Sequence, residues 1–273
     1  MLYFAYGSNL NLDELSERWG HRPRVVATAF WPDARLRFHY RSPARGGGAL
    51  DLEEHIGSAV PGVLFDADLD VLDRKEGVGA GRYRRIEGVA ITADGPVHAL
   101  TYRVADAHRQ ARFVAPTADY ERIVREGLRT FDLPHHMLEL ALAHGSGTWP
   151  GDVFVYGTLK RGHLREPLMR DDTLCSVNEA SVAGRLLDLG EYPGLIRGEG
   201  RVHGEVWRYR SLKRLFATLD SVEDFEGWER LETSMYHRTL VQADVRGTAH
   251  WAWAYEYRGE DGTLIPDGSW SRD

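Results

Sequence analysis

The sequence has little of what several protein classes need. It has one cysteine, Cys175, in 273 residues, which excludes an internal disulfide and a cysteine-based zinc site and suits a reducing compartment such as the cytoplasm. No apolar run is long enough to span a membrane, and no basic segment followed by an apolar stretch opens the chain, so we expect neither a membrane span nor a signal peptide. The net charge is −7 without any lysine or arginine block, which argues against nucleic acid or an anionic membrane as the main partner.

Large apolar side chains, in contrast, are plentiful enough to fill real cores. Hydrophobic residues make up 42% of the chain, and 8 Trp and 12 Tyr are among them, so global disorder is not expected. A chain of 273 residues has room for one large domain or two small ones. Composition therefore predicts a globular protein and leaves the number of domains open.

A short motif occurs twice, at residues 4–10 and, in altered form, at residues 154–160. Each copy opens as an apolar run, which predicts a buried strand, and then reaches a glycine followed by a hydroxyl residue. A strand that stops on glycine leaves successive backbone N–H groups pointing at one spot, where a carboxylate, a phosphate or an oxyanion can bind. We call residues 6–10 the first cradle and residues 156–159 the second cradle.

Further markers follow each cradle in the same order. A Leu-Asp pair comes shortly before Glu76 in the first half and shortly before Glu223 in the second, and Tyr83 and Tyr236 come next. Markers that recur in the same order at nearly constant spacing indicate an internal repeat. The sequence therefore predicts that the chain is a tandem duplication.

The glycine-rich stretch 144–151 is the clearest linker in the chain. We place the domain boundary there and expect two similar domains, residues 1–147 and residues 148–273. Each should combine several strands with few helices, so the predicted fold class is α+β.

Local patterns add some detail to the first domain. Residues 25–30 and 35–40 read as two separate strands. Residues 117–131 carry the strongest helical pattern, with Thr117 as the N-cap, and a second helix is expected after Pro134. Neither helix has a counterpart in the second half.

The chemistry follows from combining a cradle with one carboxylate. Glu76 and Glu223 each have apolar neighbours in sequence, and burial beside apolar groups raises the pKa of a carboxyl toward the range useful for proton transfer. Backbone donors and one such glutamate suit an acyl transfer in which the enzyme supplies no nucleophile. That reaction is possible when the substrate carries its own attacking amine.

Here the motifs resemble a known family. Residues 3–10, with residues 72–78 and Tyr83, resemble a gamma-glutamylcyclotransferase. Residues 153–162, with Tyr192-Pro193-Gly194-Leu195, residues 219–223 and the closing residues 265–270, resemble the related gamma-glutamylamine cyclotransferase branch. Together the two resemblances cover nearly the whole chain.

The resemblance implies a small mixed β-barrel with a few helices in each domain, and an enzyme that releases 5-oxoproline from a gamma-glutamyl amide. It implies a small gamma-glutamyl compound as the partner and requires no metal or cofactor. Glu76 and Glu223 would be the general acid/base residues. The residues that it assigns to substrate binding are Tyr6, Gly7, Ser8, Asn9, Leu10 and Tyr83 in the first copy, and Tyr156, Gly157, Thr158, Leu159 and Tyr236 in the second.

Several alternatives stay open at this point. The second copy crowds other acidic residues near Glu223, so Glu226 competes with it for the catalytic role, and the first copy has a shorter link before Glu76 than is usual in the family. Tyr83 and Tyr236 fit core aromatics with bonded hydroxyls as well as substrate contacts. The rival to an enzyme is a binding protein for gamma-glutamyl or other small carboxylate ligands, with one or both sites inactive. One copy could also serve only as a structural partner of the other.

Overall fold

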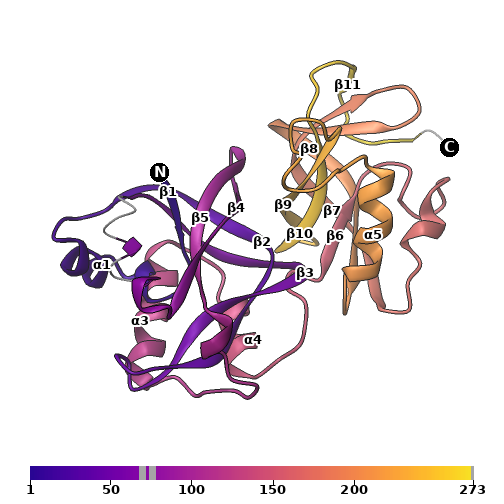
Figure 1. Ribbon diagram of the computed structural model, residues 1–273. Helices are drawn as coiled ribbons and strands as arrows, with labels where there is room; N and C mark the ends of the chain where they lie inside the picture. Colours follow the sequence, from indigo (N-terminus) through magenta and orange to yellow (C-terminus); the bar gives the residue numbers. More distant parts are fainter. Residues whose placement is uncertain (68–71, 74–77, 272–273) are drawn as a thin grey trace. The chain divides into compact units, whose positions relative to one another are not determined.

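The computed structural model describes residues 1–67, 72–73 and 78–271 of the chain (Figure 1). The chain divides into two compact units, Met1–Trp149 and Pro150–Asp273. Strands dominate both units and helices are few, so the predicted α+β class is confirmed. Each unit is described below by itself.

The first unit is a closed five-stranded barrel with strand order β1-β3-β2-β4-β5. Strand β1 is antiparallel to β3 and parallel to β5, and this last pairing closes the barrel. The bounds of the strands are β1 Leu2–Ala5, β2 Arg24–Ser42, β3 Gly47–Asp66, β4 Tyr83–Thr92 and β5 Gly95–Val104.

Strand β2 corrects one expectation, because residues 25–30 and 35–40 belong to a single strand of 19 residues. The register between β2 and β3 shifts between Pro32 and Ala34, where Asp33 has a φ of 52°. The carboxylate of Asp33 accepts a hydrogen bond from the Gly57 N–H at 2.9 Å. An irregularity stabilised in this way bends a strand without ending it, so the residues between the two predicted strands form a bulge and not a break.

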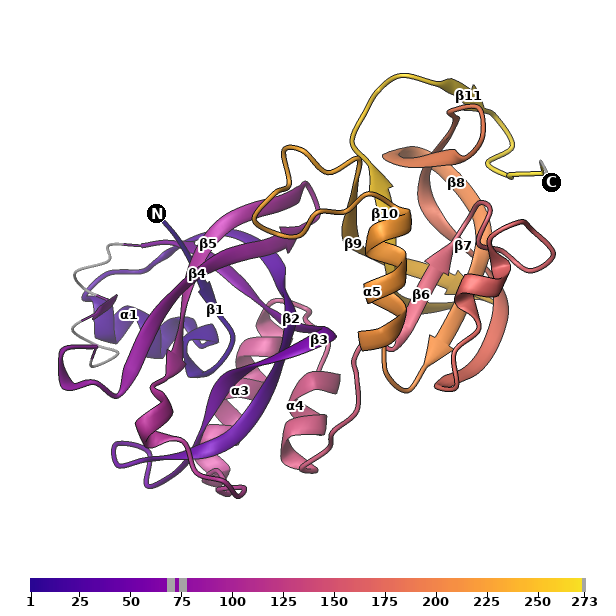
Figure 2. The ribbon, with the colours of Figure 1, turned by 45° about the vertical axis from the view of Figure 1, so that its right-hand side comes forward.

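The helices of the first unit begin at side-chain caps. Asn11 accepts hydrogen bonds from the first turn of α1 (Leu12–Trp19), and Thr117 caps α3 (Ala118–Thr130). Helix α4 (His136–Leu142) follows, and α3 and α4 lie beside the long strands of the barrel (Figure 2). The short 3-10 turns are η1 (Ser8–Leu10), η2 (Val78–Ala80) and η3 (Asp106–His108).

The second unit repeats the connectivity of the first. Its sheet has the order β11-β7-β8-β6-β10-β9, with a further β7–β9 pairing that joins five of these strands in a ring. Strand β6 is antiparallel to β8 and parallel to β10, as β1 is to β3 and β5. The bounds are β6 Asp152–Val155, η4 Glu166–Met169, β7 Leu174–Asp188, β8 Pro193–Tyr209, α5 Lys213–Val222, β9 Tyr236–Val245, β10 Thr248–Tyr257 and β11 Thr263–Ile265.

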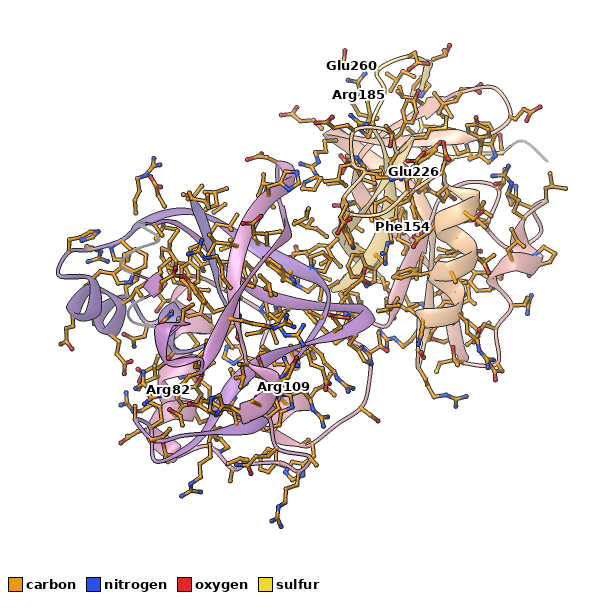
Figure 3. The ribbon with its side chains drawn as sticks, in the orientation of Figure 1. Arg82, Arg109, Phe154, Arg185, Glu226 and Glu260 are labelled. Carbon is orange, nitrogen blue, oxygen red and sulfur yellow. The ribbon has the colours of Figure 1, made fainter. Side chains whose placement is uncertain are left out.

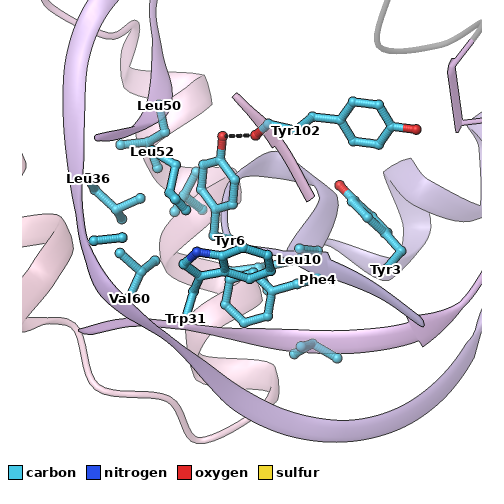
Figure 4. Packing of buried hydrophobic residues seen from close by; sticks show 14 of the residues in the cluster. Tyr3, Phe4, Tyr6, Leu10, Trp31, Leu36, Leu50, Leu52, Val60 and Tyr102 are labelled. Carbon is cyan, nitrogen blue, oxygen red and sulfur yellow. Dashed lines mark hydrogen bonds between the residues drawn. The ribbon is translucent and has the colours of Figure 1, made fainter. Parts of the chain in front are cut away.

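In both units a glycine of a neighbouring strand comes very close to the four-residue strand, β1 or β6. A Cβ atom at Gly62 would lie 2.3 Å from the Ala5 carbonyl oxygen, and a Cβ atom at Gly204 would lie 2.2 Å from the Val155 carbonyl oxygen. The Phe4 ring, which is buried in the core of the first unit (Figure 4), packs against Gly62, and the buried Phe154 ring packs against Gly204 in the second unit. Only glycine leaves room for the short strand and this ring together.

We therefore expect Gly62→Ala and Gly204→Ala to destabilise their units by about 1–3 kcal/mol or more, because overpacking a closed core displaces backbone. Gly79→Ala is the matched control, since a Cβ atom there meets no atom of the described residues within 4 Å. Denaturant unfolding of the three variants would measure the difference. Equal stability of Gly204→Ala and Gly79→Ala would contradict the packing argument.

Candidate active site

The second unit contains a cavity of about 300 Å³ at the end of strand β6. The two parts of the predicted site, the second cradle and Glu223, both line it. The lining residues are Phe154, Val155, Tyr156, Gly157, Thr158, Leu159, Arg165, Tyr192, Pro193, Val222, Glu223, Asp224, Met235, Tyr236 and Tyr255. All members of the second cradle therefore line a single cavity with the carboxyl group.

The second cradle begins where β6 ends. Among the described residues, no hydrogen bond uses the backbone N–H groups of Gly157, Thr158 or Leu159. The N–H of Lys160, in contrast, donates to the Gly157 carbonyl oxygen at 3.1 Å and closes the turn. The cradle therefore offers three consecutive donors to a ligand, which is the arrangement that favours binding of an anion.

Two contacts hold the loop that follows the second cradle. The buried carboxylate of Glu205 accepts hydrogen bonds from the backbone N–H and the Nε of Arg161, at 3.0 and 2.8 Å. Lys160 donates from Nζ to the Trp270 carbonyl oxygen at 2.7 Å. The loop is thus tied to β8 and to the C-terminal segment, which stabilises the position of the cradle.

Glu223 directly follows the last residue of α5, and its N–H donates to the Leu219 carbonyl oxygen at 2.8 Å. Its side chain is only partly exposed and lines the cavity. Burial raises the pKa of Glu223 to about 7, and the positive charge of Arg165 acts in the opposite direction. A carboxyl with a pKa near neutrality can both accept and return a proton at cellular pH.

Glu226, the competing carboxylate, occupies a different environment. Its side chain, which is labelled in Figure 3, is exposed and is not among the residues that line the cavity. Thr233 donates a hydrogen bond to its carboxylate at 2.8 Å, and Arg230 lies 3.5 Å from the same oxygen. The geometry therefore brings Glu223, and not Glu226, to the cradle.

The tyrosines of the site are held by hydrogen bonds to the backbone. Tyr236 lines the cavity and donates its hydroxyl to the Pro193 carbonyl oxygen at 3.0 Å. Tyr156 donates to the Tyr255 carbonyl oxygen at 2.7 Å. Both hydroxyls are therefore structural donors, and these two residues offer a ligand mainly their rings.

The first unit has a cavity of about 410 Å³ in the equivalent place. Tyr6, Gly7, Ser8, Asn9 and Tyr83 line it, together with the ring of Tyr40 and the side chains of Arg45 and Arg82. Leu10 is not a lining residue: it is fully buried, and its N–H donates to the Gly7 carbonyl oxygen at 3.0 Å. The first cradle therefore offers donors from fewer residues than the sequence predicted. Glu76 lies outside the described residues.

The structure adds residues that the sequence did not single out. Arg165 is the one arginine or lysine among the described residues that line the second cavity, and its guanidinium lies 5.8 Å from the ring centre of Tyr192. Tyr255 and Asp220 are joined by a hydrogen bond of 2.6 Å from the tyrosine hydroxyl to the carboxylate. The Leu-Asp pair was a sequence signal for Asp220, whereas Arg165 and Tyr255 had none.

Comparison with known proteins gives the family. A family model described as gamma-glutamyl cyclotransferase, AIG2-like, matches residues 153–272. A putative gamma-glutamylcyclotransferase from Vibrio cholerae is 35% identical over 118 residues, which cover 43% of this chain and 93% of the relative. The chain belongs to the gamma-glutamylcyclotransferase family. The resemblance seen in the motifs of the second half is thereby confirmed, and the protein is an enzyme of the gamma-glutamylcyclotransferase type.

A second curated relative of this gamma-glutamylcyclotransferase agrees with that placement. A gamma-L-glutamyl-butirosin B gamma-glutamyl cyclotransferase from Niallia circulans is 34% identical over 111 residues, covering 40% of this chain and 69% of the relative. A solved structure of a gamma-glutamyl cyclotransferase is 27% identical, with a TM-score of 0.46, and covers 52% of this chain and 86% of that one. Within the described residues, the helices are too short or too polar to cross a bilayer.

The raised pKa of Glu223 makes a prediction about stability. Because the folded pKa of about 7 lies above the ordinary value of 4.5, the folded state holds the proton more tightly than the unfolded state. The stability that this proton contributes is complete below pH 4.5 and is lost as the pH rises through 7. We expect Glu223→Gln to be more stable than the parent at pH 8, by on the order of 1–3 kcal/mol, and nearly equal to it at low pH.

Denaturant unfolding at pH 4.5 and pH 8 would measure this difference. Glu226→Gln is the matched control, because it removes an exposed carboxylate on the same segment and should change stability little at either pH. The same stability change for Glu223→Gln at both pH values would show that burial does not disfavour the charged carboxylate.

Proposed function

We propose that this enzyme cleaves a small gamma-glutamyl amide and releases 5-oxoproline and a free amine, with Glu223 as the general acid/base of the second unit. The observation that carries the proposal is that three residues whose backbone N–H groups have no partner in the described part of the chain line one cavity with a carboxyl whose pKa is near 7. The donors suit the α-carboxylate of the glutamyl group, and the carboxyl suits proton transfer.

The reaction needs no nucleophile from the enzyme. Glu223, as the carboxylate, takes a proton from the α-amine of the substrate, and the amine nitrogen attacks the γ-carbonyl carbon to close the five-membered ring. The bond from that carbon to the departing nitrogen breaks, and Glu223 returns the proton to the leaving amine. Holding amine and carbonyl together in the cavity removes much of the entropic barrier, roughly 7–11 kcal/mol in favourable cases.

The specificity of the enzyme depends on which leaving amine the cavity accepts. Arg165 and Tyr192 line the same cavity as Glu223, and the Arg165 guanidinium lies 5.8 Å from the ring centre of Tyr192. In this proposal they offer the amine side of the substrate a cation and an aromatic face. The relative from Niallia circulans is named for gamma-L-glutamyl-butirosin B, which favours including gamma-glutamyl derivatives of larger amines beside gamma-glutamyl peptides. A substrate panel should cover both.

We also propose that the first unit is a second copy of the same domain. The equal cyclic order of strands, with the same parallel and antiparallel partners for β1 and β6, supports a tandem duplication. The cavity at the first cradle supports a second binding site. In this proposal Glu76 is the general acid/base residue of the first unit.

The test is 5-oxoproline release from a panel of gamma-glutamyl amides by the parent, Glu76→Gln, Glu223→Gln and the double variant. If the second unit is active, Glu223→Gln lowers the kcat of that unit at least about 100-fold, because no carboxylate is left to accept the proton. If both units work, each single variant loses part of the activity and the double variant loses all of it.

Glu226→Gln serves as the control and should keep parent activity. Full activity of the double variant would contradict the assignment of both glutamates. If the parent released no 5-oxoproline from any amide but still bound gamma-glutamyl ligands by calorimetry, the binding-protein alternative would replace the enzymatic proposal for these substrates.

A further inference from the structure

A chain of hydrogen bonds joins the second cradle to the helix that precedes Glu223. Tyr156, the residue before Gly157, donates its hydroxyl to the Tyr255 carbonyl oxygen at 2.7 Å. The Tyr255 hydroxyl in turn donates to the Asp220 carboxylate at 2.6 Å. Asp220 lies on α5 one turn before Glu223. The two sides of the cavity are therefore connected through a single residue of β10.

A buried arginine holds Asp220 from another direction. Arg238 is 4% exposed, and its Nε lies 3.1 Å from the Asp220 carboxylate. Its guanidinium carbon lies 4.5–5.7 Å from the centres of four aromatic rings, those of Phe216, Phe225, Trp228 and Trp253. These rings come from α5, from β10 and from the segment directly after Glu223. Cation–π contacts thus fix the chain on both sides of the glutamate.

The first unit contains the same connection. Tyr6 donates its hydroxyl to the Tyr102 carbonyl oxygen at 2.6 Å (Figure 4), and the Tyr102 hydroxyl donates to Asp73 at 2.6 Å. Arg85 forms an ion pair with the same carboxylate. Two units that differ in their surrounding loops therefore share the tyrosine, the tyrosine carbonyl and the Asp-Arg pair in one arrangement. Such a shared arrangement suits a task that both sites have in common.

We propose that Tyr255 and Asp220 are positioning residues that fix the carboxyl group of Glu223 relative to the second cradle. The proposal rests on the proposed function, since it assigns Glu223 the proton transfer. Helix ends fray unless they are anchored, and Glu223 follows the last residue of α5. A displacement of about 1 Å in a catalytic group can lower the rate on the order of 100-fold. The hydrogen bond between Tyr255 and Asp220, which we call the anchor of Glu223, therefore acts on catalysis rather than on substrate binding.

The test compares Tyr255→Phe with Tyr209→Phe, each in the Glu76→Gln background so that only the second unit turns over. Tyr209 is the matched control, because it is equally buried and donates its hydroxyl to the Met169 carbonyl oxygen at 2.7 Å, but does not line the cavity. We expect Tyr255→Phe to lower kcat about 10- to 100-fold with KM within threefold of the parent, and Tyr209→Phe to keep kcat within threefold. Asp220→Asn, which keeps an acceptor oxygen, should show an intermediate loss.

Backbone hydrogen exchange supplies a readout that does not depend on activity. We expect the amides of residues 219–223 to exchange at least tenfold faster in Tyr255→Phe than in Tyr209→Phe. Unchanged exchange there, or a kcat equal to that of Tyr209→Phe, would overturn the positioning role. If the Glu76→Gln parent releases no 5-oxoproline while exchange responds as expected, the anchor stands and the proposed reaction of the second unit fails.

Discussion

Each unit depends on a strand of only four residues that is inserted between an antiparallel and a parallel neighbour. Strands β1 and β6 are almost wholly buried, and the parallel pairing with β5 or β10 closes the ring of strands. The chain leaves this strand at Gly7 or Gly157, so the direction of the cradle N–H groups is set by the barrel and not by a flexible loop. Gly62 and Gly204 are required because any side chain there would displace the short strand.

The second unit places a carboxyl where its charge is disfavoured. Burial raises the pKa of Glu223 to about 7, and a perturbed pKa of this kind is a recurrent mark of functional sites. Around it, Asp220 is held by Tyr255 and Arg238, and Glu205 holds the loop after the cradle. A destabilised group inside a rigid, hydrogen-bonded frame is the arrangement expected of a general acid/base residue.

Sequence reasoning found the features that are local in the chain. The strand followed by glycine pointed to residues 6–10 and 156–159, most of which line the two cavities, and the Leu-Asp pair pointed to Glu223, which lines the second cavity. It missed Tyr255 because that residue meets Tyr156 only through a parallel pairing between strands 99 positions apart. It divided β2 between residues 30 and 35 because a bulge held by a distant partner leaves no local signal, and it counted the Leu10 N–H as a ligand donor although the turn uses it. These differences all involve contacts that form only in the folded chain and that the spacing of residues in the sequence does not reveal.

The central claim is that the Glu223 carboxyl of this gamma-glutamylcyclotransferase is tuned for proton transfer near neutral pH. A carbon-13 NMR titration of the glutamate carboxyls tests it most directly, with the Glu223 signal assigned by its loss in Glu223→Gln. A midpoint near pH 7 is the predicted result. A midpoint near 4.5, the ordinary value for glutamate, would contradict the account.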